Sequence, residues 1–112
     1  MINADQALAT ATIAADCAVV SSKLDRVQAQ WLRAHALPAR RITLSRKTDG
    51  GDTEEFWLVT DHTGFDDSSF RVVYDDVSAQ YGIECTIGSD VNLFAGFRAS
   101  LLDAVIDIKF TR

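Results

Sequence analysis

The chain has 112 residues, of which 47% are hydrophobic and 24% are charged. These values are ordinary for a globular domain, and a chain of this length buries enough core to fold without a disulfide or a metal. No stretch reaches the roughly 20 apolar residues of a membrane span, and the first five residues lack the basic head of a secretion signal, so we expect one cytoplasmic domain over residues 1–112.

The net charge of −5 is unevenly distributed. Residues 1–47 contain seven Lys or Arg and three Asp or Glu, whereas residues 48–112 contain four and thirteen. Such asymmetry indicates either a partner surface or a basic first strand that lies beside an acidic second strand. We favour the second interpretation, because opposite charges on neighbouring strands stabilise their pairing. A nucleic-acid partner is not expected, since the domain is acidic and has no RNA-binding or helix-turn-helix signature.

Residues 3–36 are expected to be helical. Asn3 and Gln6 have the spacing of a capping box. An apolar stripe with spacings of three and four continues through Ile13, Cys17, Val20, Leu24, Val27 and Trp31. Because the stripe stays in phase, we prefer one long helix, with a kink near residues 21–22 as the alternative. Pro38 ends the helix, and an overhanging helix would offer a homodimer contact.

Residues 41–97 are expected to form an antiparallel sheet. The predicted strands are Arg41–Lys47, Glu55–Asp61, Ser69–Asp75, Gln80–Ile87 and Val91–Gly96. Their short connections predict a five-stranded meander. Residues 98–109 follow as a helix whose apolar stripe packs on the sheet. The fold class is therefore α+β: a long N-terminal helix, a five-stranded antiparallel β-meander and a C-terminal helix.

Acidic residues that are distant in the sequence should meet at one end of this sheet. Turns of a meander alternate between its two ends, so the turns after the first and third strands share an end. The predicted partner-binding residues there are Asp49, Asp52, Glu54, Asp75 and Asp76, with Trp57 as an anchor beside them. Trp57, Val59, Val73 and Phe94 are expected on the face opposite the main core, as an exposed patch or beneath a helix.

The His62 loop, DHTGFDD, is the best candidate for catalysis or metal binding, because a histidine between carboxylates can act as a general base or a ligand. The strands supply no second histidine, and the acids lack the spacing of a calcium loop. A phosphate-binding loop, a nucleophile elbow and a CxxC pair are also missing. We therefore expect no catalytic residue, no metal site and no cofactor.

The segment from Phe70 to Ile106 has a recognisable pattern. A strand ending in Tyr74-Asp75-Asp76 is followed by a strand beginning Gln80-Tyr81-Gly82-Ile83, by the run 93–97 (LFAGF) and by a Leu-rich helix. This pattern resembles small bacterial immunity-type proteins, which neutralise a cognate toxin. The resemblance implies an acidic α+β protein that acts by tight protein–protein association. Many such toxins are basic nucleases, which an acidic surface would attract.

The expected function is a non-enzymatic protein-binding domain, most concretely an immunity-like inhibitor that occludes a partner protein through acidic loops. The alternative is a dimeric acidic adaptor or secretion chaperone, whose long helix makes the dimer and whose partner is a secreted effector. The third hypothesis is a small enzyme or metal protein centred on His62.

Overall fold

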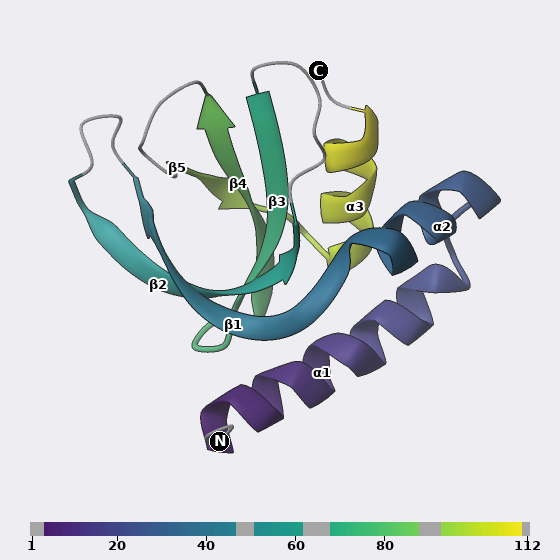
Figure 1. Ribbon diagram of the computed structural model, residues 1–112, viewed down its shortest axis with the longest axis horizontal. Coiled ribbons are helices and arrows are strands. Elements are labelled where there is room, and N and C mark those ends of the chain that lie inside the picture. The colour runs from purple at the N-terminus through teal and green to yellow at the C-terminus, as the bar shows by residue number, and fades with distance from the viewer. Residues whose placement is uncertain (1–3, 47–50, 62–67, 88–92, 111–112) are drawn as a thin grey trace.

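The computed structural model describes residues 4–46, 51–61, 68–87 and 93–110 (Figure 1). Its elements are α1 (Ala4–Ser21), α2 (Arg26–His35), β1 (Ala36–Ser45), β2 (Thr53–Thr60), β3 (Ser68–Asp75), β4 (Gln80–Ile87), β5 (Leu93–Phe97) and α3 (Leu101–Phe110). The predicted α+β class is confirmed: the five strands pair in sequential order, and a helix at each end of the chain contacts them. No helix in these ranges is both long and apolar enough to cross a membrane.

The N-terminal helical segment is two helices, so the preferred single helix is wrong. α1 ends at Ser21, and Asp25 caps α2: its Oδ1 accepts from the Gln28 backbone N–H at 2.8 Å, while Gln28 Oε1 accepts from the Asp25 N–H at 3.1 Å. This capping box begins a new helix in a new direction. The residues of the apolar stripe therefore do not all face the same side of the helical segment: Val27 is exposed, whereas Trp31 is buried.

β1 begins at Ala36, well before the predicted Arg41, because the backbone is already extended at the end of α2 (φ −66°, ψ 135° at Ala36). Its pairing with β2 shifts register between Ala36 and Arg40. That interval contains Pro38, which has no N–H to donate to a neighbouring strand. The other four strands begin and end within two residues of their predicted bounds.

The sheet closes into a barrel, which the sequence did not predict. β1 pairs with β5 in parallel through Ser45 and Leu93. The interior is filled by Leu44, Phe56, Leu58, Val73 and Phe94. The rings of Phe56 and Phe94 stack with their centroids 4.6 Å apart. A barrel of so few strands has room only for side chains, so this interior is a core.

The helices cover part of the outer face of the strands (Figure 1). A second core there joins helix residues such as Ile13 and Leu32 to the outward side chains of β2, β3 and β4. The four residues expected on one face divide between the two cores: Trp57 and Val59 lie outside, and Val73 and Phe94 lie inside. The register between β2 and β3 decides this division, because directly paired residues point to the same face of a sheet. Trp57 pairs with Tyr74 on the outer face, and Leu58 pairs with Val73 on the inner face. All four are buried.

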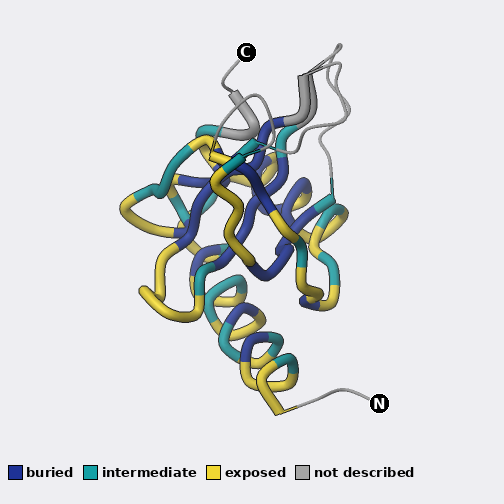
Figure 2. Tube along the Cα trace, turned by 90° about the vertical axis from the view of Figure 1, so that its left-hand side faces the viewer, coloured by how far each residue is buried: buried dark blue, intermediate teal, exposed yellow. Residues whose placement is uncertain are grey.

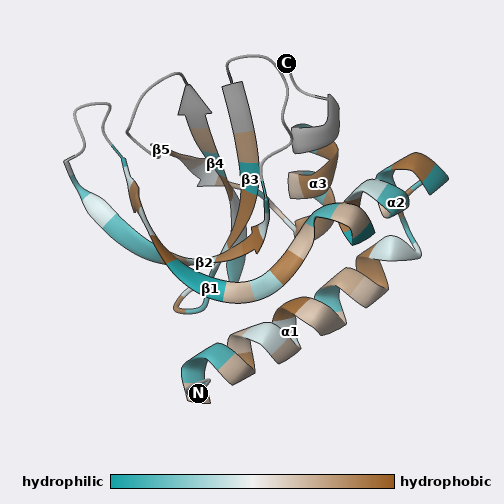
Figure 3. Ribbon diagram, viewed as in Figure 1, coloured by the Kyte–Doolittle hydropathy of each residue, from teal (hydrophilic) through white to brown (hydrophobic). Residues whose placement is uncertain are grey.

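Helix α1 is only partly embedded in the fold. Figure 2 shows buried and exposed residues alternating around it, and Figure 3 shows pale to brown colours along most of its length after a hydrophilic first turn. Ala9, Ile13 and Val20 are buried, whereas Leu8 and Val19 are 69% and 56% exposed. α1 therefore presents apolar side chains to solvent as well as to the core.

Candidate functional site

The turn between β3 and β4, residues 76–79, contributes to one part of the predicted acidic edge. Asp75 organises this turn: its Oδ1 accepts from the Val77 backbone N–H at 3.0 Å, and its Oδ2 accepts from Ser78 Oγ at 2.8 Å. Val77 is 93% exposed. The turn is thus held in shape by its own side chains while it presents an apolar residue next to two carboxylates.

Asp76 lies over Trp57. Its Oδ2 accepts from Trp57 Nε1 at 3.1 Å and from Arg41 Nη2 at 3.4 Å, and the Arg41 guanidinium stacks 4.1 Å above the indole ring. Trp57 is only 2% exposed, so the prediction that it is a surface anchor is wrong. Its role is to support Asp76, whose side chain remains 34% exposed.

Two of the other predicted acids lie at the start of β2. Asp52 and Glu54 are exposed, and Glu54 Oε2 accepts from Arg46 Nη2 at 2.8 Å. Asp49 lies outside the described residues. The pairing of Trp57 with Tyr74 places the first half of β2 beside the end of β3. The hydrogen bond to Glu54 raises the pKa of Arg46, and the Asp52 and Asp75 carboxylates contribute to the same shift, so these acids lie at the same end of the sheet as the β3–β4 turn.

A first hollow, of about 130 Å³, lies between α1 and the end of β3. Its lining residues are Asp5, Leu8, Ala9, Thr12, Tyr74 and Asp76. Asp5 and Asp76 supply its carboxylates, and Leu8 supplies an exposed apolar wall. Burial raises the pKa of Tyr74, with a further contribution from nearby carboxylates, so its hydroxyl stays neutral at ordinary pH.

A second hollow, of about 290 Å³, lies further along α1. It is lined by three residues of α1, by residues where the turn enters β4 and by residues where the chain enters α3. These are Asp16, Val19 and Val20, then Ala79, Gln80 and Tyr81, and then Ala99, Ser100 and Leu101. Tyr81 Oη donates to Asp16 Oδ2 at 2.6 Å, which links β4 to the helix. Burial, and then this hydrogen bond, raise the pKa of Tyr81 far above its usual value. The hydroxyl therefore remains a donor and keeps the Asp16 carboxylate oriented.

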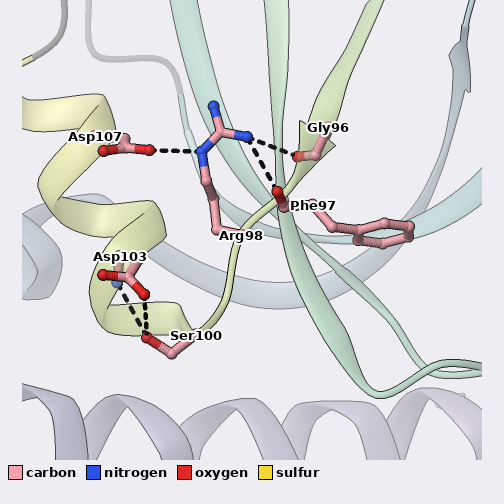
Figure 4. A network of polar contacts seen from close by, with 6 residues as sticks. All are labelled: Gly96, Phe97, Arg98, Ser100, Asp103 and Asp107. Atoms are coloured by element: carbon pink, nitrogen blue, oxygen red, sulfur yellow. Dashed lines mark hydrogen bonds and ion pairs between the residues drawn. The ribbon is translucent and has the colours of Figure 1, made fainter.

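The α3 wall of the second hollow is braced by Arg98 (Figure 4). Arg98 Nε donates to Asp107 Oδ2 at 2.5 Å, and its Nη1 donates to the carbonyls of Gly96 and Phe97 at 3.3 and 3.2 Å. Ser100 Oγ accepts from the Asp103 backbone N–H at 3.2 Å and so caps α3. These contacts fix the path from β5 into α3.

The histidine hypothesis concerns a segment that lies outside the described residues, because His62 is one of residues 62–67. The neighbouring Asp61 hydrogen-bonds through Oδ1 to His35 Nδ1, and the His35 ring stacks on Trp31 at 5.0 Å. Within the described ranges, no group of three His, Cys, Asp or Glu side chains is placed to hold a metal ion. Cys17 and Cys85 are not joined by a disulfide.

Comparisons with protein-family models, with curated proteins and with solved structures found no match. The candidate site is accordingly defined by geometry alone. The candidate site takes Asp75 and Asp76 from the predicted set and adds Asp5, Leu8, Asp16 and Val19 of α1, none of which belongs to the apolar stripe on which the helix prediction was based. One available signal was that Asp-x-x-Leu at 5–8 recurs as Asp-x-x-Val at 16–19.

Proposed function

We propose that this chain is a non-enzymatic protein-binding domain, most concretely an immunity-like inhibitor that occludes a basic partner protein. The observation that carries the proposal is the β3–β4 turn, where Val77 is 93% exposed beside the carboxylates of Asp75 and Asp76. An exposed apolar residue among charges of one sign is typical of a surface that selects its partner by charge and gains affinity by apolar contact.

Rigidity of the turn supports the same proposal. Asp75 makes two hydrogen bonds within the turn, and Asp76 is held by Trp57 and Arg41. A contact surface that is ordered before binding loses little conformational entropy when the partner arrives. The net charge of −5 also increases the encounter rate with a basic partner.

The test uses Val77, because Asp75 and Asp76 also hold the turn together. The probe is a basic protein encoded next to this chain's gene, with binding followed by surface-based kinetics at low salt. We expect Val77→Lys to slow association about tenfold and Val77→Glu to leave the association rate near wild type. An unchanged rate in Val77→Lys, or no binding by the wild type, would contradict the proposal.

A matched control comes from α2. Val27→Lys makes the same substitution at another exposed valine, which lines neither hollow. It should alter the association rate less than Val77→Lys does. Equal effects would mean that only overall charge matters, and the assignment to the turn would be wrong.

The dimeric adaptor remains a second candidate because of the exposed apolar residues of the first two helices. Leu8 and Val19 on α1 and Val27 on α2 are each more than half exposed. An adaptor of this kind would be a dimer through these helices and would hold a secreted effector. Size-exclusion chromatography with light scattering tests it, and a monomer at high concentration excludes it.

A further inference from the structure

Two positions along α1 carry the same kind of pair, an aspartate followed three residues later by an aliphatic side chain. Asp5 and Leu8 line the first hollow, and Asp16 and Val19 line the second. The second pair follows the first after eleven residues, which is about three turns of α-helix, so the two pairs lie on the same face about 16 Å apart. The two hollows therefore repeat one arrangement: a carboxylate beside an exposed apolar side chain.

The opposite wall of both hollows comes from one short piece of chain. Tyr74 and Asp76 line the first hollow, and Ala79, Gln80 and Tyr81 line the second. The chain passes from one wall to the other through Val77 and Ser78. The two hollows and the turn that connects their walls lie along α1, and we call them together the α1 groove.

The charge of the α1 groove limits what can occupy it. Its charged lining residues are Asp5, Asp16 and Asp76, all acidic. The Arg41 side chain pairs with Asp76, and Tyr81 donates to Asp16, so these two carboxylates are held in place. A segment with lysine or arginine beside its apolar anchors would complement both the sign and the apolar walls.

The spacing of the two α1 pairs favours a helical occupant. Two anchors about 16 Å apart correspond to three turns of a helix, which return to the same face. In an extended segment the same distance is about five residues, and residues separated by an odd number point to opposite faces. A helix can therefore fill both hollows from one side, whereas a strand cannot.

We propose that the α1 groove binds a basic amphipathic helix of the partner protein, with two apolar anchors three turns apart that enter the two hollows. This inference rests on the proposed function and adds the chemistry and conformation of the partner segment. Small residues between the anchors allow the helix to pass over Val77 and Ser78.

The test uses synthetic helical peptides built from alanine and lysine. One peptide carries two leucines three turns apart, and a second has the same composition with the leucines two turns apart. A third replaces every lysine of the first with glutamate. Fluorescence anisotropy against the full chain should show the first peptide binding about tenfold more tightly than the second, with no binding of the third.

Variants of the protein assign the effect to the groove. Leu8→Asp and Val19→Asp change exposed positions, so the fold is retained, and each should abolish the preference for the first peptide. Val27→Asp is the matched control, because Val27 is 57% exposed but lines neither hollow. It should leave the preference unchanged.

Equal binding of the first two peptides, or a preference that survives Leu8→Asp and Val19→Asp, would overturn the inference. If that occurs while Val77→Lys still slows association of the basic protein partner, only the helical groove is wrong. If Val77→Lys has no effect on that partner, the proposed function fails, whatever the peptides do.

Discussion

Arg71 and Glu84 form an ion pair inside the barrel, at directly opposed positions of β3 and β4. Both side chains point inward, as Val73 does two residues after Arg71. Glu84 is fully buried, and Arg71 is 7% exposed. Taking two charges out of water has a large desolvation cost, which the pairing offsets only while both partners are present.

Removing one partner of this pair should therefore destabilise the fold strongly. We expect Glu84→Gln to lower the free energy of unfolding by about 3–5 kcal/mol, because Arg71 would remain as an uncompensated buried charge. Urea denaturation measures the loss. Glu54→Gln, which breaks the exposed pair with Arg46, should cost under about 1 kcal/mol. Similar losses in the two variants would contradict the buried pairing.

Gly82 should not tolerate a side chain. A Cβ at this position would lie 2.6 Å from Cε1 of Phe94, whose ring is stacked on Phe56 in the barrel interior. We expect Gly82→Ala to cost about 1–3 kcal/mol by overpacking. In the double variant with Phe94→Leu, the two losses should be less than additive. Full additivity in urea denaturation would show that the two sites are independent.

Stability should fall at alkaline pH because of the two tyrosines. The pKa values of Tyr74 and Tyr81 are raised in the folded protein, so at high pH the folded state binds more protons than the unfolded state. The contribution of the two tyrosines to the free energy of unfolding is complete below about pH 10, which is the pKa of tyrosine in the unfolded chain. This contribution is lost as pH rises above that value. Tyrosinate absorbance should therefore appear together with loss of the circular dichroism signal.

Asp16→Asn tests the cause of this behaviour at Tyr81. The amide oxygen can still accept the hydrogen bond, but the negative charge is removed, so Tyr81 should ionise at a lower pH than in the wild type. Tyrosinate absorbance in the wild type near pH 10, with circular dichroism unchanged, would contradict the predicted shift.

The capping residue Asp25 should determine where α2 begins. Asp25→Ala removes the acceptor for the Gln28 N–H and should cost about 1 kcal/mol in thermal or urea unfolding. Asp25→Ser retains a capping oxygen and should recover most of that loss. If alanine and serine behave alike, the cap does not stabilise the helix start.

Local patterns in the sequence determined most of the secondary structure. The alternation of Tyr81, Ile83 and Cys85 identified β4, and short polar connections identified the order and direction of the strands. The break before α2 also had a local signal, since Asp25 and Gln28 have capping-box spacing. The prediction used only the continuous apolar stripe, and periodicity alone does not show where a helix changes direction.

Tertiary structure decided the closure of the barrel and the composition of the site. Hydropathy alternation reveals that a strand has two faces, but the pairing register determines which faces meet, and so Val73 and Phe94 lie apart from Trp57. Packing of α1 against the β3–β4 turn brought Asp16 to Tyr81. Contacts between residues so distant in sequence depend on how the elements dock, which no local pattern encodes.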